Sequence, residues 1–375
     1  MVYWIINYFL CIVVSVLLAG VILPSIMQIA RRRSLYDDID DRKIHKGVVP
    51  RLGGIAFLPA LTFSFCIVLG INVRFQLNGI DGLLPGSIIN IFFLFCSLML
   101  MYMIGIADDL VQVRYRTKFL FQVIAGSIFV LAGLWPADLY GFLGIHQWPT
   151  ILGWITAVFL VVYITNAINL IDGIDGLASG ISIIAMALYS FVFISTGHYV
   201  YAMFIGATFG TLIPFFYYNV FGKVERHKKI FMGDTGTLTI GVVLSFMVLQ
   251  AINVPQESVA TGDNIFILAV APILLPCFDV VRVFFHRLKK GRNPFLPDRC
   301  HIHHKLLALG CRQWQALIAI LAADAAFVIM NLWVSPYLNP TLVILGDVLI
   351  WILANILLTR SIRAREMRLG VVLYD

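Results

Sequence analysis

The sequence predicts an all-α, polytopic membrane protein with about eleven transmembrane helices. Of its 375 residues, 60% are hydrophobic and only 13% are charged, and the mean hydropathy is +0.92. These values lie far outside the usual range for a soluble domain of this size. Apolar runs of roughly 17–25 residues, the length that spans a bilayer core as a helix, also follow one another along the whole chain.

The expected helices can be marked off in chain order, and their length and number favour helices over buried strands. The run at 119–134 is the shortest. The first run has no basic segment before it and is followed by three arginines, so we expect an uncleaved anchor and not a signal peptide. The expected spans are 3–28, 52–71, 88–107, 119–134, 151–170, 177–195, 200–219, 235–252, 265–285, 314–333 and 341–359.

Lys and Arg residues predict which helix ends face the cytoplasm. Five segments and Arg282 hold 26 of the 27 Lys and Arg residues, and only Arg74 falls on the other side. By the positive-inside rule, the N-terminus is outside and the C-terminus is cytoplasmic. We therefore expect a single membrane domain over 1–375. Its expected cytoplasmic segments are 31–51, 108–118, 220–233, 286–313 and the tail 360–375.

The net charge of +7 does not require a nucleic-acid partner. Basic loops beside a membrane act mostly as topology signals and contacts to anionic lipids. The six cysteines lie in expected spans or in a cytoplasmic loop, where a disulfide is not expected.

Acidic residues gather at the cytoplasmic ends of the expected helices. An isolated acid at such a position is most simply a helix cap in the headgroup zone. Several acids converging on one face are different, because like charges held together repel unless a cation or a proton is shared. The acids concerned are Asp108, Asp109, Asp172, Asp175, Asp234 and Asp279.

One motif places polar side chains at every third position. In NAINLIDGID, Asn166, Asn169, Asp172 and Asp175 would project from roughly one side of a helical path. The glycines that follow interrupt the helix, and irregular backbone at this depth is tolerated only where it lines protein or water. The sequence therefore predicts a polar crevice that faces the cytoplasm.

Carboxylates and an amide oxygen are hard ligands that suit Mg²⁺, which usually bridges one or two protein acids to substrate phosphates. Asp234 stands in GDTG at a helix start, where free N–H groups favour anions. Cationic side chains are available in Lys118 and in the segment 291–307. Cys300 with His301, His303 and His304 could instead form a zinc site, although no second ligand pair follows. Phosphate-loop and dinucleotide motifs are absent.

Six motifs together resemble the polyprenyl-phosphate N-acetylhexosamine-1-phosphate transferases of glycosyltransferase family 4. The resemblance covers nearly the whole chain, in order. The motifs are HKGVVPRLGG (45–54), ADDL (107–110), NAINLIDGIDGLA (166–178), FMGDTGTL (231–238), FDVVRV (278–283) and GRNPFLPDRCHIHHKLL (291–307).

This resemblance implies a Mg²⁺-dependent transfer, with Mn²⁺ as an alternative metal. A UDP-N-acetylhexosamine would donate the sugar-1-phosphate to undecaprenyl phosphate in the cell inner membrane and release UMP. The resemblance also allows a homodimer. Asp108 would deprotonate or orient the lipid phosphate, and Asp175 and Phe231 would contact uracil. The implied catalytic residues are Asp108, Asp109 and Asp172, the metal ligands Asn169 and Asp234, and the substrate contacts Lys118, Asn166, Asp175, Phe231, His301, His303, His304, His45 and Arg51.

The first-loop and histidine motifs resemble the branch that makes surface polysaccharides such as O-antigen, with GlcNAc-1-phosphate as the expected group transferred. The peptidoglycan branch, which transfers phospho-N-acetylmuramoyl-pentapeptide, is the alternative within the class. A cation-coupled transporter is the alternative of another class, but its acids would lie near the bilayer midplane.

The pentapeptide GIDGL occurs twice, at 79–83 and at 173–177. The first copy falls between two expected spans on the outer side and predicts a turn. The second falls on the cytoplasmic side beside the other acids, so Asp175 is a site candidate and Asp81 is not.

Overall fold

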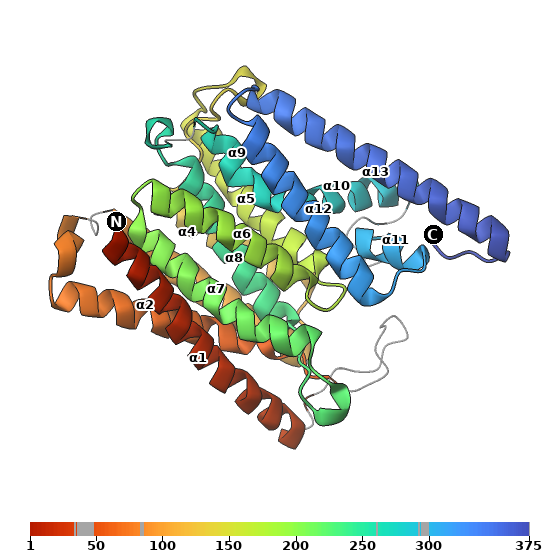
Figure 1. Cartoon of the computed structure of the whole chain (residues 1–375), viewed down its shortest axis with the longest axis horizontal. Coiled ribbons are helices and arrows are strands. Elements are labelled where there is room, and N and C mark those ends of the chain that lie inside the picture. Colours follow the sequence, from red (N-terminus) through yellow and green to blue (C-terminus); the bar gives the residue numbers. More distant parts are fainter. Residues whose placement is uncertain are drawn as a thin grey trace.

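The computed structural model describes residues 1–33, 35, 49–82, 86–259, 262–291, 293 and 300–374. Over these residues the backbone forms thirteen α-helices joined by short 3₁₀ turns, with no β-strand (Figure 1). The helices are α1 Val2–Arg33, α2 Phe57–Arg74, α3 Ser87–Val111, α4 Tyr115–Leu131, α5 Thr150–Ile171, α6 Leu177–Ser195, α7 Tyr199–Val220, α8 Gly233–Ile252, α9 Ile265–Val270, α10 Leu274–Lys289, α11 Ile302–Ala308, α12 Gln313–Val334 and α13 Pro340–Leu369.

Ten helical segments in the described part of the chain are long and apolar enough to cross a membrane. The prediction of an all-α, polytopic membrane protein is thereby confirmed. The eleventh expected span, 119–134, is present as α4, but this helix has only 17 residues. At 1.5 Å per residue it is about 26 Å long, somewhat short of a hydrocarbon core of about 30 Å. The N-out orientation stays a prediction.

Helix α8 is the centre of the fold. Every residue from Thr235 to Ile252 is buried, and α3, α5, α6 and α9 pack around the helix. Close packing depends on small residues, as in other membrane helix pairs. At Gly241, for example, a Cβ would come within 2.6 Å of Thr165 Cα on α5. The central position of α8 fixes where its first residues lie relative to the ends of its neighbours.

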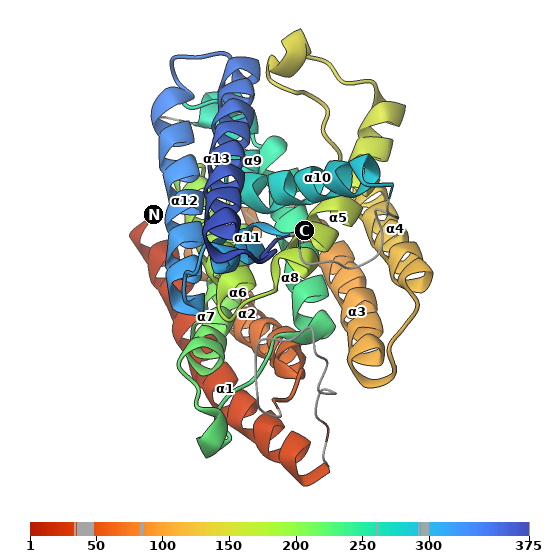
Figure 2. The ribbon, with the colours of Figure 1, turned by 90° about the vertical axis from the view of Figure 1, so that its right-hand side faces the viewer.

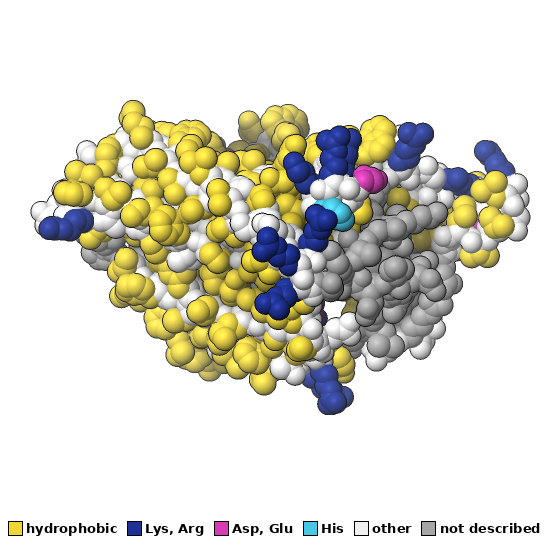
Figure 3. All heavy atoms as spheres, turned by 90° about the horizontal axis from the view of Figure 1, so that it is seen from below, with side chains coloured by type: hydrophobic (Ala, Val, Ile, Leu, Met, Phe, Trp, Pro, Cys, Tyr) yellow, Lys and Arg dark blue, Asp and Glu magenta, His cyan; other side chains and the backbone are white. Residues whose placement is uncertain are grey.

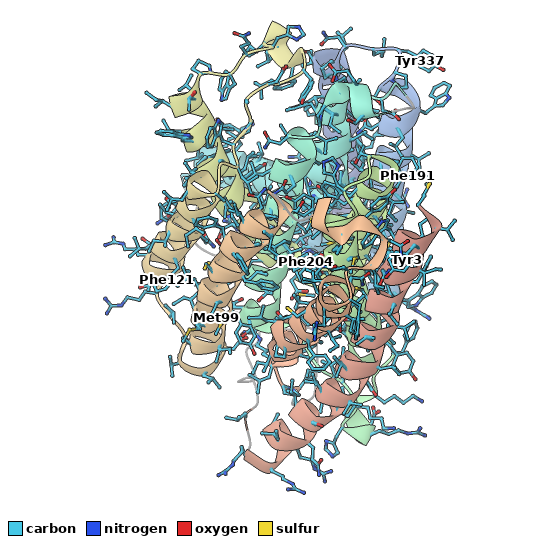
Figure 4. All side chains as sticks on the ribbon, turned by 90° about the vertical axis from the view of Figure 1, so that its left-hand side faces the viewer. Tyr3, Met99, Phe121, Phe191, Phe204 and Tyr337 are labelled. Carbon is cyan, nitrogen blue, oxygen red and sulfur yellow. The ribbon has the colours of Figure 1, made fainter. Side chains whose placement is uncertain are left out.

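In a second group of helices, α1 and α2 pack against α7. On α1, Ser15 donates a hydrogen bond to the carbonyl of Ala207 on α7 at 2.6 Å. Phe204, also on α7 and labelled in Figure 4, is fully buried. Its ring centroid lies 5.4 Å from that of Phe65 and 6.0 Å from that of Phe95. These contacts tie the N-terminal helices to the rest of the bundle.

The expected span at 265–285 is not one straight helix. It breaks at a 3₁₀ turn, Ala271–Ile273, which separates α9 from α10. Pro272 lies in this turn and Pro276 in the first turn of α10, and proline has no N–H to continue a helical hydrogen-bond ladder. In Figure 2, α10 runs across the long axes of α12 and α13. Sequence patterning could not show this change of direction.

Residues 79–82 of the first GIDGL copy lie in 3₁₀ turns between α2 and α3, with positive φ at Asn78 and Gly79. It is at the opposite end of α3 from Asp108, and that helix of 25 residues is about 37 Å long. The two copies of the pentapeptide therefore lie at different ends of the bundle.

Lys and Arg side chains are not spread evenly over the surface. On the face drawn in Figure 3 they gather in the middle and toward the right, beside residues that are not described, while the left of the view is mainly hydrophobic. A broad apolar surface with most of its basic groups gathered in one part is the distribution expected for a protein embedded in a bilayer.

Candidate active site

The end of α3 and the starts of α4 and α8 meet at one cationic side chain. Lys118 Nζ on α4 lies 3.0 Å from Asp108 Oδ2 on α3 and 2.9 Å from Asp234 Oδ2 on α8. The lysine is 23% exposed and Asp234 is 29% exposed, so the pair can be reached from outside. The structure thus brings together three of the predicted site residues around a shared positive charge.

Asn169 joins the end of α5 to the same group. Its side-chain Nδ2 donates hydrogen bonds to Asp234 Oδ1 at 2.8 Å and to Thr237 Oγ1 at 2.7 Å. With Lys118 on one carboxylate oxygen and Asn169 on the other, the orientation of Asp234 is fixed. We call Asp108, Lys118, Asn169 and Asp234 the acid cluster.

Asp109 has different partners from its neighbour Asp108. Its carboxylate accepts hydrogen bonds from the backbone N–H of Asp234 at 2.7 Å and of Thr235 at 2.9 Å. These N–H groups are among those that a helix start leaves without intrahelical partners. Asp109 therefore anchors the first turn of α8 to the end of α3. Its predicted catalytic role stays a prediction, and its observed contacts are positioning contacts.

The chain before α2 packs against the start of α8. The N–H groups of Gly53 and Gly54 donate to the carbonyls of Phe231 and Met232 at 3.0 and 2.8 Å. A Cβ at Gly54 would come within 2.0 Å of the Gly236 nitrogen, so only glycine permits this approach. The predicted uracil contact Phe231 is thereby held at the edge of the site. Of the two first-loop candidates, Arg51 is described and His45 lies outside the described residues.

Helix α5 ends at Ile171, and Asp172 then leads into the second GIDGL copy at 173–177. Loss of contact with water raises the pKa of Asp172 to about 7, and Asp175 and Asp234 raise it in the same direction, while Arg51 lowers it. Asp175 Oδ2 lies 2.6 Å from Lys229 Nζ in the segment that leads to α8. Asp172 therefore lies near Asp234 of the acid cluster, and Asp175 lies near Asp172.

Asn166 is not part of the acid cluster. One and a half turns before the end of α5, it donates to Gln122 Oε1 on α4 at 2.7 Å and to the carbonyl of Val162. The residues at the predicted three-residue spacing therefore have different partners. Asn166 joins α5 to α4, Asn169 contacts Asp234 and Asp175 pairs with Lys229.

The histidine segment is held by a buried carboxylate on α10. Asp279 Oδ2 lies 2.8 Å from His301 Nδ1, and its Oδ1 accepts a hydrogen bond from the N–H of Ile302 at 3.1 Å. Arg282 donates to the same carboxylate at 2.8 Å. The carbonyl of Cys300 accepts the Tyr374 hydroxyl at 2.6 Å, so the end of the chain also supports this segment.

His303 brings this segment into contact with the second GIDGL copy. A Cβ at Gly173 would come within 2.1 Å of His303 Nε2, so the ring lies directly on the glycine. Burial lowers the pKa of His303 well below its ordinary value, and His304 and His301 lower it further, which keeps the ring neutral. Neither ring nitrogen has a hydrogen-bond partner among the described residues. A buried, unsatisfied imidazole is unfavourable alone, so a ligand group is its natural partner.

No group of three or more His, Cys, Asp or Glu side chains is arranged to hold a metal ion in the part of the chain that the structure describes. Mg²⁺ requires less, because it typically takes one or two protein carboxylates and completes its shell with water and substrate phosphates. Asp234 and the amide oxygen of Asn169, with Asp108 nearby, are hard oxygen donors of the right kind. The residues present therefore fit a Mg²⁺ site.

Several residues of the site were missed in the sequence. Lys229 pairs with Asp175, and Gln122 pairs with Asn166. No local signal marks either partner. Arg282 stands three positions after Asp279 on α10, which is the spacing of a helical ion pair, and this pattern could have identified Arg282 as a support of the histidine segment.

The fold and these contacts define a polytopic membrane protein with an acidic, cation-bearing site at one end of its helices. The model of glycosyl transferase family 4 matches residues 91–252, which include the whole acid cluster. The undecaprenyl-phosphate alpha-N-acetylglucosaminyl 1-phosphate transferase of Salmonella typhi is 30% identical over 302 residues, covering 80% of this chain and 76% of that protein. The chain belongs to this family of membrane sugar-1-phosphate transferases.

Two further relatives bear similar names. The undecaprenyl-phosphate alpha-N-acetylglucosaminyl 1-phosphate transferase of Yersinia pestis is 29% identical over 302 residues, covering 80% of this chain and 76% of that protein. The probable undecaprenyl-phosphate N-acetylglucosaminyl 1-phosphate transferase of Bacillus subtilis is 28% identical over 349 residues, covering 90% of this chain and 89% of that protein. The similarity thus extends over most of the bundle.

Proposed function

We propose that this protein transfers N-acetylglucosamine-1-phosphate from UDP-N-acetylglucosamine to undecaprenyl phosphate and releases UMP. The observation that carries the proposal is the convergence of Asp108, Lys118 and Asp234 at the end of three helices. The names of the relatives supply the donor sugar and the lipid acceptor. The reaction would be the first membrane step in the synthesis of a cell-surface polysaccharide, with the site on the cytoplasmic face of the inner membrane.

The residues are suited to phosphoryl transfer, which depends mainly on positioning and on neutralisation of charge. Mg²⁺, when bound by Asp234 and Asn169, would offset charge on the diphosphate of the donor. Lys118 would place a second positive charge beside the reacting phosphates. The acceptor, a phosphate monoester, loses its second proton near pH 6, so Asp108 has little need to be a strong base and would chiefly orient the acceptor.

The sugar donor would lie between the acid cluster and the histidine segment. Asp175 and Phe231 are proposed to hold the uracil ring. The ring of His303 is neutral and both of its nitrogens are unsatisfied. One nitrogen would donate a hydrogen bond to the sugar or the diphosphate, and the other would accept one from a sugar hydroxyl. His301 and His304 lie with centroids 5.8 and 4.1 Å from that of His303 and would complete this wall.

The proposal is tested with membranes or purified protein that contain this chain. UMP should be released from UDP-N-acetylglucosamine only when undecaprenyl phosphate and Mg²⁺ are both present, and tunicamycin, an inhibitor of this family, should block the release. Release that ignores the added lipid would contradict the assignment of the acceptor.

The donor is tested by running the same assay over a panel of UDP-sugars. Turnover of UDP-N-acetylmuramoyl-pentapeptide in place of UDP-N-acetylglucosamine would move the protein to the peptidoglycan branch. Turnover of another UDP-N-acetylhexosamine would keep the reaction and replace the donor.

A further inference from the structure

A groove separate from the acid cluster lies between α10 and α13. Its volume is about 610 Å³, within the range of small-molecule sites. One wall is built by Phe278 and Phe285 of α10, and the other by Trp351 and Ile352 of α13. Phe285 is 63% exposed and Ile352 is 46% exposed. The groove is therefore open at the surface and lined mainly by apolar side chains, which suits a hydrocarbon chain.

Cations line the same groove. Lys305 of α11, Arg282 of α10 and Arg360 and Arg363 of α13 all contribute to it, and no Asp or Glu is among the described residues that line it. Arg282 is paired with Asp279 at 2.8 Å, so its charge is balanced. The remaining three cations, Lys305, Arg360 and Arg363, give the described lining a net positive charge. The acids that act on them, Asp279 on Lys305 and Glu366 beside Arg363, lie outside this lining.

Lys305 shows that the positive charge of the groove is not fully exposed to solvent. The residue is only 4% exposed, and its ammonium donates to two neutral oxygens, Asn355 Oδ1 at 2.9 Å and Thr359 Oγ1 at 3.1 Å. Burial and the charge of Arg282 together lower the pKa of Lys305 to about 8, against an opposing effect of Asp279. A buried ammonium surrounded by neutral acceptors is costly, and an anion placed beside it would remove much of that cost.

Helix α10 separates the groove from the acid cluster. On its other side α10 packs on α5, where the Tyr163 hydroxyl donates to the carbonyl of Cys277 at 2.6 Å. No member of the acid cluster lines the groove. An occupant would therefore contact α10, α11 and α13 without entering the site of the proposed reaction.

We propose that the groove between α10 and α13 binds one anionic glycerophospholipid, with an acyl chain against the apolar walls and its phosphate at Lys305, Arg360 and Arg363. Charge complementarity selects an anionic lipid over a zwitterionic one, because each Lys or Arg near a membrane surface contributes to binding of anionic headgroups. The lipid would join α10 and α13 to α11, which carries His303 and His304. It would thereby stabilise the histidine segment.

The proposal is tested by native mass spectrometry of the full-length protein after removal of lipid and addition of phosphatidylglycerol or phosphatidylcholine. One phosphatidylglycerol should be retained, with an affinity about tenfold or more above that for phosphatidylcholine. The double variant Arg360→Ala/Arg363→Ala should lose this preference. The matched control Arg31→Ala/Arg32→Ala, at the exposed end of α1, should keep it.

A second variant tests the apolar part of the groove. Ile352→Trp fills it without changing charge, and should reduce retention of phosphatidylglycerol and abolish the rise in melting temperature that this lipid gives the wild type. Equal retention of phosphatidylglycerol and phosphatidylcholine would overturn the proposal, and so would an equal loss of the preference in the α1 control. Binding of undecaprenyl phosphate that is tighter than that of phosphatidylglycerol and depends on Arg360 would also overturn it. These readouts do not use catalysis, so they are independent of the proposed function.

Discussion

Asn169 donates a hydrogen bond to Asp234 at 2.8 Å, and this contact joins the last turn of α5 to the first turn of α8. The second carboxylate oxygen of Asp234 faces Lys118 at 2.9 Å. Both oxygens are therefore oriented before any ligand arrives. Lys118, together with a Mg²⁺ ion held by the oriented carboxylate, would place preorganised positive charge where negative charge develops on a phosphate.

Asp234→Asn should abolish turnover, with a loss of roughly 100-fold or more, because a charged oxygen ligand and the partner of Lys118 are removed together. Asparagine keeps the shape of the side chain, so expression and melting temperature should change little. UMP release over a Mg²⁺ titration measures the effect. Asp138→Asn, beyond the other end of α4, is the control and should retain activity. Retained activity with unchanged Mg²⁺ dependence in Asp234→Asn would remove this residue from the metal site.

The two GIDGL copies offer a matched pair of substitutions. Asp175→Asn should raise the KM for the UDP-sugar, because it removes the partner of Lys229 at 2.6 Å and the proposed uracil contact. Asp81→Asn makes the same change in the same pentapeptide at the far end of α3 and should leave the kinetics unchanged. Steady-state assays with varied UDP-sugar compare the two. Loss of activity in Asp81→Asn with normal protein levels would require the topology to be redrawn.

Tyr374→Phe tests the support of the histidine segment from the end of the chain. The variant loses the hydroxyl that donates to the carbonyl of Cys300 and accepts from Arg282. The KM for the UDP-sugar should rise by about 2- to 10-fold, the equivalent of one hydrogen bond, while the KM for undecaprenyl phosphate stays unchanged. Tyr337→Phe, where the side chain is 79% exposed, is the control. An equal change in both KM values would argue for a general structural effect.

Gly54→Ala should destabilise the protein by about 1–3 kcal/mol, because the new methyl group would overlap the backbone of Gly236. The start of α8 would shift and activity should fall with it. Gly70→Ala is the control, since a Cβ there meets nothing within 4 Å and alanine is the better helix former. Melting temperatures in detergent distinguish the two. Equal stability of both variants would contradict the packing of the first loop on α8.

The pH dependence of stability tests the environment of Asp172, whose pKa is raised to about 7. In the unfolded chain this pKa is about 3.9, so between these values the folded state holds a proton that the unfolded state releases. The contribution of Asp172 is therefore most favourable below pH 4, declines as the pH rises to about 7 and is constant above. Asp172→Asn removes this decline, so its melting temperature relative to the wild type should rise from pH 5 to pH 7 and then level off. Parallel curves across this range would contradict the raised pKa.

Much of the fold could be predicted because membrane helices are encoded locally. The expected span 177–195 coincides with α6, and 151–170 differs from α5 by one residue at each end. The acids were also found, since ionisable groups are rare in apolar helices. The change of direction at Ala271–Ile273 was not predicted, because a proline shows that a helix is interrupted and not where the next segment goes.

The partners of the site residues could not be predicted, and Asp109 illustrates the reason. Its place beside Asp108 in the sequence favoured a shared catalytic role, whereas its contacts hold the N–H groups of α8. The same holds for Tyr374, which nothing in the tail marks as a support for Cys300. Contacts of this kind depend on how helices pack and not on the order of residues within them.

The sequence by itself determined that this is a helical membrane protein, where most of its helices lie and which motifs carry acidic side chains, because hydropathy and charge act over single segments. Only the tertiary structure decided that Lys118 bridges Asp108 to Asp234, which is 116 residues from the lysine in the chain. It also decided that Asp109 holds the first turn of α8, 125 residues further on. The physical reason is the packing around α8. Small residues let its neighbours approach closely, and this approach brings the ends of α3, α4 and α5 to a single polar site.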